Sequence, residues 1–290
     1  VYEIDYQRST IGKVRFDTAE AHCKQLETVL EKSKLYEQLT FVGEFRRKLE
    51  VIGHLEAVIE TEKRLELHDF LNQIEGILPS PQNSSPFIWK GVFENTQLQI
   101  AIYFASKEDF VKQVFIHSAS IEHLKQSLES PLGITNLFEF SHKKNFESEE
   151  VIYQNLGLNF IPSELREGTF EFEKAKKEPF NLIETQDVKG ILHAHSTYSD
   201  GKNTLEEMAV HCKNLGYEYL GITDHSKTAF YANGLQEARI EKQHQEIDIL
   251  NQKLAPFKIF KGIESDILNN GDLDYENSVL EKFDFIIASV

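Results

Sequence analysis

Cysteine, positive charge and long apolar runs are all scarce in this chain of 290 residues, and each shortage excludes a class of protein. The two cysteines, Cys23 and Cys212, both fall inside helical patterns, so we expect no disulfide framework and a reducing cytoplasm. No apolar stretch is long enough to span a membrane and no signal peptide is visible, so we expect no membrane partner. Lysine and arginine number 31 against 47 aspartates and glutamates, a formal net charge of -16. That balance disfavours a broadly basic surface for nucleic acid, so any contact with DNA must be local or assisted by metal.

Methionine occurs once, as Met208, and the first residue is Val1, so we expect that the amino end is not a native translation start. The remaining composition is typical of a globular protein, with 40% hydrophobic and 11% aromatic residues over a length sufficient for two domains. Neither property determines the oligomeric state.

Short apolar segments alternate with helical patterns in the last hundred residues. Segments 189–193, 217–223 and 257–263 are rich in Ile, Leu, Phe and Tyr and predict buried strands, each separated from the next by a helix. This repetition predicts parallel βαβ units, which place their chemistry at the carboxyl ends of the strands. Residues 283–290 predict a fourth strand at which the chain stops, so we expect a fragment of a barrel with an unpaired edge.

Potential metal ligands follow these predicted strands. His193 and His195 are two apart on an extended segment and therefore point to the same side. Asp200 precedes a glycine that allows a tight turn, and His225 and Glu264 follow the next two strands. Imidazole and carboxylate ligands together suit Zn, Mn or Fe. Any one of these residues alone would be an ordinary surface group, but their order and strand positions predict a shared metal site.

These motifs resemble the polymerase and histidinol phosphatase (PHP) domain, and the likeness covers residues 188–290. The resemblance implies a distorted β/α barrel that holds up to three divalent metals and hydrolyses phosphoesters. It also implies that the metal ligands, and with them the catalytic residues, are His193, His195, Asp200, His225 and Glu264. Asp266 faces the same way as Glu264 and is interpreted as an outer carboxylate. Further ligands of that family come after the fourth strand, so we expect only partial metal occupancy in this chain.

The amino-terminal half begins with a helix on a sheet. Apolar residues at helical spacing predict a helix over 16–34, followed by a strand over 39–42. A turn containing Arg46 and Arg47 then leads to an alternating strand over 53–59, on which His54 and Glu56 share one face.

This arrangement resembles the palm of a family X DNA polymerase, in which Gly-Ser, two arginines and Gly-Asp-x-Asp hold a nucleoside triphosphate and two metals. Here Glu44 takes the place of the serine, and His54 and Glu56 take the places of the two aspartates. Gln97 is interpreted as standing in the place of a third aspartate. Two-metal phosphoryl transfer needs anionic ligands, so we expect the polymerase site to be inactive and not to serve Mg or Mn.

Arg46 and Arg47 keep a phosphate-binding role under this resemblance, because a guanidinium binds phosphate whether or not catalysis occurs. A solvated charged turn is the alternative, and the sequence leaves both open. Ser118, Ala119, Ser120 and His123 fall where the family has Thr-Gly-Ser and a histidine near the nucleotide.

Residues 156–167 resemble the passage by which bacterial family X polymerases enter their PHP domain, and the charged stretch 168–187 predicts a connector. The predicted fold is therefore α/β: an α+β, nucleotidyltransferase-like palm and thumb, followed by the first part of a distorted β/α barrel. We assign residues 1–145 to the degenerate palm and thumb, 146–187 to the thumb end and linker, and 188–290 to the PHP domain.

The leading functional hypothesis is a metal-dependent phosphoesterase that acts as a 3′-5′ exonuclease or processes 3′ ends of DNA, beside an inactive polymerase half. One rival is a working gap-filling repair polymerase that tolerates Mn. The others are a phosphatase for a small ester such as histidinol phosphate and a non-catalytic DNA-binding scaffold. DNA ends or gapped duplex are the expected partners under the first two readings.

Overall fold

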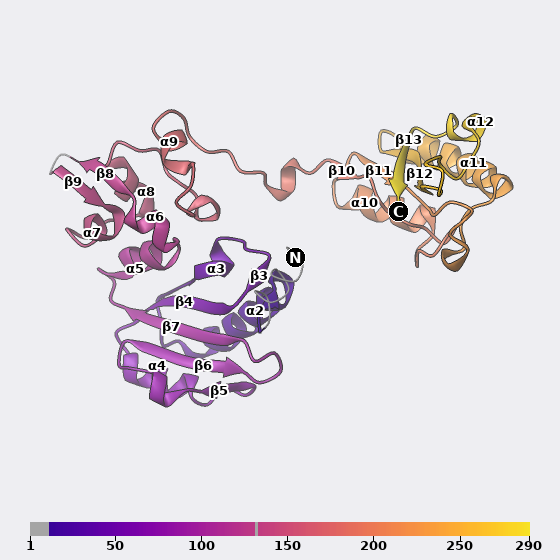
Figure 1. Cartoon of the computed structure of the whole chain (residues 1–290). Helices are drawn as coiled ribbons and strands as arrows, with labels where there is room; N and C mark the ends of the chain where they lie inside the picture. Colours follow the sequence, from indigo (N-terminus) through magenta and orange to yellow (C-terminus); the bar gives the residue numbers. More distant parts are fainter. Residues whose placement is uncertain (1–11, 131–132) are drawn as a thin grey trace. The chain divides into compact units, whose positions relative to one another are not determined.

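The computed structural model describes residues 12–130 and 133–290, which form two compact units, and each is described by itself. Unit 1 extends to Asn181 and unit 2 comprises Leu182–Val290, so the division falls inside the predicted connector. Figure 1 shows the elements of both. Val1, on which the expectation about the amino end depends, lies outside the described residues. No helix among the described residues combines the length and the apolar character needed to cross a bilayer.

A five-stranded sheet organises the first part of unit 1, in the order β2-β4-β7-β6-β5. The central pair, β4 and β7, is parallel, and the other neighbours are antiparallel. The strands are β2 (Gln38–Val42), β4 (His54–Glu60), β5 (Ile77–Pro79), β6 (Ile88–Phe93) and β7 (Gln99–Ala105). The accompanying elements are β1 (Val14–Arg15), α2 (Phe16–Ser33), α3 (Gly43–Arg46), β3 (Val51–Ile52), α4 (Arg64–Leu71) and the 3₁₀ helix η1 (Pro81–Asn83).

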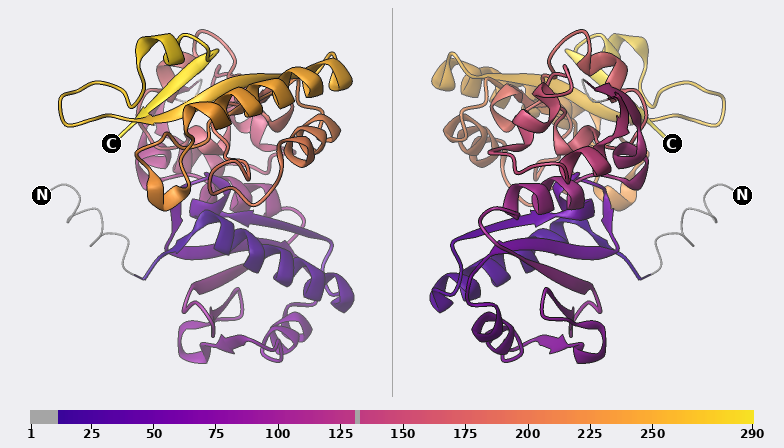
Figure 2. Two further views of the ribbon diagram at one scale, coloured as in Figure 1. Left: turned by 90° about the vertical axis from the view of Figure 1, so that its right-hand side faces the viewer. Right: turned by 90° about the vertical axis from the view of Figure 1, so that its left-hand side faces the viewer.

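The alternation of side chains along β4 decides which face of this sheet is covered. Leu55, Ala57 and Ile59 are buried on one face and share a core with residues of α2 and α4. Figure 1 and Figure 2 show the ribbons of the sheet and of these helices. The predicted helix over 16–34 is thereby confirmed, with Leu26 and Leu30 inside that core. The opposite face carries His54 and Glu56 toward a cavity.

The rest of unit 1 is helical with one hairpin and has a core of its own. Its elements are α5 (Phe110–His117), α6 (Ile121–Lys125), β8 (Ser127–Ser130), β9 (Gly133–Asn136), α7 (Leu137–Ser141), α8 (Glu149–Gln154), η2 (Ser163–Leu165) and α9 (Glu171–Ala175). Arg166 is completely buried there, and its guanidinium carbon lies 5.4–5.5 Å from the ring centroids of Phe115, Tyr153 and Phe160. A buried cation of this kind needs a counter-charge, which Glu149 provides.

Unit 2 is built on four parallel strands in sequential order, β10-β11-β12-β13, as the sequence predicts. The strands are β10 (Gly190–Ile191), β11 (Tyr219–Ile222), β12 (Lys258–Asp266) and β13 (Phe285–Ser289), joined by α10 (Leu205–Asn214), α11 (Glu237–Leu254) and α12 (Asn277–Leu280). The 3₁₀ turn η3 (Thr185–Asp187) precedes β10, and a second, η4 (Phe230–Ala232), lies between β11 and α11. Because all four strands run the same way, their carboxyl ends meet at one edge of the sheet. The predicted α/β fold, with part of a β/α barrel in the carboxyl-terminal half, is confirmed.

Candidate functional site

The five ligands predicted for unit 2 converge at the carboxyl ends of its strands. His193 and His195 follow β10, His225 follows β11, Glu264 lies near the end of β12, and Asp200 lies in the loop after the histidine pair. They form two groups of ligand atoms, each within 4.8 Å: one contains His193, His195 and Glu264, and the other contains His195, Asp200 and His225. His195 belongs to both groups, so the five residues form one continuous cluster.

The carboxylate of Glu264 is the centre of this cluster. Its Oε2 lies 3.4 Å from His193 Nε2, 3.1 Å from His195 Nε2 and 3.3 Å from His225 Nδ1. Burial favours the neutral acid, but hydrogen bonds from Ser289 and His193 and the charge of His225 outweigh it and hold the pKa of Glu264 below its usual value. A carboxylate kept ionised among three imidazoles is a good ligand for a divalent cation.

Asp200 closes the other side of the cluster. Its Oδ1 lies 3.1 Å from His195 Nδ1 and its Oδ2 lies 3.7 Å from His225 Nε2. Desolvation opposes ionisation, yet the hydrogen bond with His195 and the charge of His225 leave the pKa of Asp200 lowered. Gly201 follows it where the loop turns back, and its N–H donates to the carbonyl of Ser196 at 2.9 Å. A Cβ at this position would lie 2.1 Å from the carbonyl oxygen of His195, so close backbone approach requires glycine here.

Asp224, the central residue of Thr-Asp-His, supports the ligand loop and was not predicted from the sequence. It is completely buried and accepts hydrogen bonds from both the backbone N–H and the hydroxyl of Ser196 (2.8 and 2.6 Å) and of Ser199 (3.2 and 2.5 Å). Gln243 of α11 donates a fifth hydrogen bond at 2.6 Å. Strand alternation could have given the clue, because Asp224 must point away from the side that His225 faces. Its carboxylate fixes the chain between His195 and Asp200.

Other predicted positions in unit 2 stay outside the cluster. Asp266 accepts a hydrogen bond from Thr228 Oγ1 (2.6 Å) and belongs to neither ligand group. His211 and His244 lie on α10 and α11 and belong to neither ligand group. His244 is half-buried, and burial lowers its pKa to about 4.

The donor set fits a divalent metal. Three imidazoles and two carboxylates are the mixed nitrogen and oxygen ligands that Zn, Mn or Fe accept. In addition, His225 Nδ1 is buried and makes no hydrogen bond to any described residue, although Glu264 Oε2 is close. Such an orphaned nitrogen is suited to coordination.

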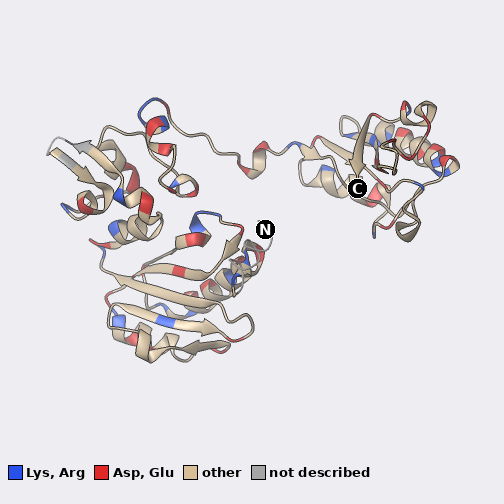
Figure 3. Cartoon of the chain, viewed as in Figure 1, with Lys and Arg blue, Asp and Glu red and all other residues tan. Residues whose placement is uncertain are grey.

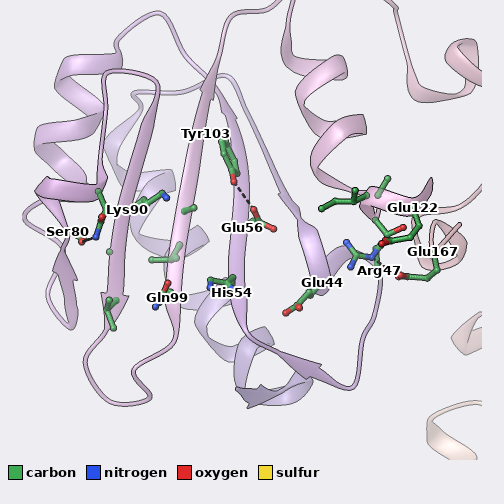
Figure 4. Close-up of a pocket in the computed structure, with 18 residues that line it drawn as sticks. Glu44, Arg47, His54, Glu56, Ser80, Lys90, Gln99, Tyr103, Glu122 and Glu167 are labelled. Carbon is green, nitrogen blue, oxygen red and sulfur yellow. Dashed lines mark hydrogen bonds and ion pairs between the residues drawn. The ribbon is translucent and has the colours of Figure 1, made fainter. Parts of the chain in front are cut away.

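Unit 1 contains a cavity of about 740 Å³ on the open face of its sheet (Figure 4). His54, Glu56, Lys90 and Gln99 line it from the strands, and Tyr103 Oη donates a 2.7 Å hydrogen bond to Glu56 Oε1. Burial raises the pKa of Glu56, although the hydrogen bond from Tyr103 works in the other direction. Glu56 is thus a poorer metal ligand than an exposed carboxylate.

The role assigned to Gln97 is wrong. Gln97 lies before β7 with φ +60° and donates its side-chain amide to the carbonyl of Glu94. Within β7, the partners of His54 and Glu56 are Gln99 and Ala101. The register of the parallel pair therefore places an amide and a methyl group, and no acid, beside the two palm positions.

Glu44 has a structural partner in the palm. Its Oε2 accepts the backbone N–H of Gly53 at 2.6 Å, which holds a carboxylate at the mouth of the cavity. Among the described residues, both groups of three or more clustered ligands fall in unit 2, so His54 and Glu56 are not accompanied by a third ligand here.

Arg46 and Arg47 are both engaged by carboxylates of the thumb. Arg46 forms a two-point contact with Glu149 at 2.5 and 3.1 Å and donates to Ser118 Oγ at 2.6 Å. Arg47 Nε lies 2.7 Å from Glu167 Oε1, and only Arg47 of the two lines the cavity. Phosphate binding by either arginine would compete with these ion pairs.

His123 also has a structural environment, because it is completely buried between Glu171 and Tyr153, each at 2.8 Å. Ala119 and Ser120, by contrast, line the cavity as predicted from their position. Along both units, basic segments are interspersed with acidic ones (Figure 3), in keeping with the excess of negative charge.

A parallel β/α sheet that gathers histidines and carboxylates at its carboxyl edge is an arrangement suited to holding a divalent metal. Residues 192–290 match the PHP domain family, so unit 2 contains a PHP domain. Over 93% of its length the chain is 33% identical to the DNA polymerase/3′-5′ exonuclease PolX of Bacillus subtilis, of which it covers 48%. The chain is therefore related to the family X DNA polymerases that carry a PHP domain, as the sequence motifs indicated.

Two further comparisons concern parts of the chain. A probable phosphatase of Caldicellulosiruptor saccharolyticus is 30% identical over 100 residues, which are 34% of this chain and 39% of that protein. A crystal structure of Leishmania infantum polymerase beta aligns with 57% of this chain and 80% of its own, at 14% identity and a TM-score of 0.42. The chain spans about half the length, or less, of these curated relatives.

Proposed function

We propose that the PHP unit is a metal-dependent phosphoesterase that removes or trims nucleotides at 3′ ends of DNA, and that the palm in this chain does not polymerise. The convergence of His193, His195, Asp200, His225 and Glu264 in one cluster carries this proposal. A divalent metal held by such a set supplies Lewis-acid activation of water and of the phosphoryl oxygens.

The residues of the chain supply binding and order. His193 and His225 present imidazole nitrogens toward Glu264, and the low pKa of its carboxyl keeps negative charge in place for the cation. The buried carboxylate of Asp224 fixes the loop that carries Asp200. The reaction needs no side-chain nucleophile, because a hydrolase with this donor set uses water.

DNA as the substrate is supported by the similarity of nearly the whole chain to a protein named as a DNA polymerase and 3′-5′ exonuclease. The palm is proposed to be inactive because its sheet presents His54, Glu56, Gln99 and Ala101 where two-metal transfer needs several carboxylates. The role of unit 1 is then to position DNA.

A small phosphate ester is the second candidate substrate. A similarity to a protein named as a probable phosphatase, over about a third of this chain, supports it. Histidinol phosphate is a suitable representative.

The experiment compares Mn- or Zn-loaded protein on a 5′-labelled oligonucleotide and on histidinol phosphate. We expect shortening of the oligonucleotide from its 3′ end and at least 100-fold loss in Glu264→Gln, with Glu281→Gln, an exposed site, as the matched control. Elemental analysis of both variants shows whether the loss follows metal content. Phosphate release from histidinol phosphate alone would favour the second candidate, and hydrolysis of neither substrate would overturn the phosphoesterase proposal.

Primer extension on gapped DNA tests the palm separately. We expect no extension with Mg or with Mn, and extension with either ion would show that the repair-polymerase reading is right.

A further inference from the structure

The loop that follows His225 holds two aromatic rings in solvent beside the metal cluster. Phe230 and Tyr231, both in η4, are 86% and 77% exposed, and their ring centroids are 6.0 Å apart. The ring of Tyr231 lies 6.2 Å from the imidazole of His225. Tyr231 therefore lies next to a predicted ligand, and Phe230 lies beside Tyr231.

This loop is anchored along its length. Thr228 donates both its backbone N–H (2.6 Å) and its hydroxyl (2.9 Å) to Asp274, and Asn233 donates to the carbonyls of Tyr198 and Ser199. Arg239 in turn donates to the backbone and the side chain of Asn233. The exposure of the rings is thus built into a fixed loop and does not come from a frayed end.

Fixed backbone geometry beyond the rings supports the same conclusion. Asn233 adopts a left-handed conformation (φ +57°), and a Cβ on Gly234 would lie 1.8 Å from the carbonyl oxygen of Ser226. Both residues turn the chain tightly back against the start of the loop, so η4 has little freedom to fold its rings inward.

We propose that Phe230 and Tyr231, whose rings meet edge to face at 78°, present an exposed ring face as the stacking platform for the nucleobase attached to a phosphoester at the proposed metal cluster. The inference rests on the proposed phosphoesterase function and adds the recognition of the base. Aromatic faces stack on any base, so this platform selects for nucleotides without selecting a sequence. It also disfavours esters of non-aromatic alcohols, which gain nothing from a ring face.

Binding is measured without metal, so that the result does not depend on catalysis. The dinucleoside monophosphate TpT is titrated in EDTA by NMR, and its dissociation constant is compared with that of an analogue in which one base is absent. We expect weaker binding of the analogue, and the double variant Phe230→Leu/Tyr231→Leu to raise the dissociation constant for TpT about 5- to 100-fold, because leucine keeps the apolar bulk but removes the ring face.

Two controls separate stacking from other effects. Tyr231→Phe retains the ring and is expected to bind TpT within twofold of the parent, and Phe170→Leu, at a 58% exposed phenylalanine of unit 1, is expected to have no effect. Far-UV circular dichroism shows that the variants are folded. Unchanged TpT affinity in the double leucine variant, or equal binding of TpT and its abasic analogue, would overturn the proposal.

Hydrolysis of TpT and its abasic analogue with Mn distinguishes this inference from the proposed phosphoesterase function on which it rests. The platform predicts a raised KM for TpT in the leucine variant with little change for the abasic analogue. If ring-dependent binding occurs in EDTA but no diester is hydrolysed with any metal, the phosphoesterase function fails while the platform stands.

Discussion

Replacing Glu149 by Gln tests whether an internal ion-pair network holds the arginine turn against the thumb. Glu149 is buried and accepts hydrogen bonds from Arg46 and from Arg166, two of which are 2.5 Å long. Although burial opposes ionisation, the charges of Arg166 and Arg46 outweigh it and keep the pKa of Glu149 below its usual value. The carboxylate is therefore ionised and bound to both cations at neutral pH.

The expected cost follows from what the substitution leaves behind. Arg166 is completely buried among three aromatic rings and already has one nitrogen, Nη2, without a hydrogen-bond partner among the described residues. Glutamine keeps an acceptor but removes the charge, so the guanidinium stays buried without a counter-ion. Removing one partner of a buried pair costs about 3–5 kcal/mol, and we expect Glu149→Gln to fall in that range.

Urea unfolding followed by tryptophan fluorescence measures this cost, because Trp89, the only tryptophan, is buried in the sheet of unit 1. Glu150→Gln, at the next and exposed residue, is the matched control and is expected to change stability by less than about 0.5 kcal/mol. A loss below about 1 kcal/mol in Glu149→Gln would refute the argument, since a surface ion pair contributes no more than that.

Three further outcomes are expected. Hydrogen bonds from His123 and from backbone N–H groups outweigh burial and lower the pKa of Glu171 from 4.5 to about 2. Its contribution of about 3 kcal/mol to the free energy of unfolding is therefore present above pH 4.5 and is lost as the pH falls toward 2. Urea midpoints between pH 5 and pH 2 should show this acid dependence in the parent and lack it in Glu171→Gln. Asp224→Asn should weaken metal binding by about 10- to 100-fold in calorimetric titration, because the amide keeps one acceptor oxygen but replaces the other by an NH₂ donor facing the serines that donate to it; parent-like affinity would contradict that role. Gly201→Ala should destabilise unit 2 by about 1–3 kcal/mol in calorimetric unfolding, since its methyl group meets the carbonyl oxygen of His195, whereas an unchanged transition would mean that the loop yields without cost.

The clustering of these candidate ligands could be predicted from the sequence because four of the five follow or end a strand and Asp200 lies in the loop after the histidine pair. Parallel strands joined by helices bring their carboxyl ends to one edge whatever the details of packing, so His193, His225 and Glu264 had to come close together. The helix over 16–34 was equally accessible, since its apolar spacing is a local property.

The palm shows where local pattern stops being sufficient. Its strand was recognised, but the register of β7 against β4 is set by pairing across the sheet, and that register places Gln99 and Ala101 beside His54 and Glu56 and leaves Gln97 outside the strand. The partner of Arg46 is a glutamate 103 residues away, which no spacing rule connects to it.

By itself, the sequence determined the order of strands and helices, the ligand types and the side of each strand on which they lie, because these follow from backbone periodicity and chain direction. Only the tertiary structure decided that the Asp224 side chain turns inward to hold the ligand loop and that Glu149 forms an ion pair with Arg46. It also decided that Phe230 and Tyr231 stay in solvent, with Tyr231 beside His225. Each of these depends on which distant groups the folded chain brings within a few ångströms, where hydrogen bonds, ion pairs and burial are settled together.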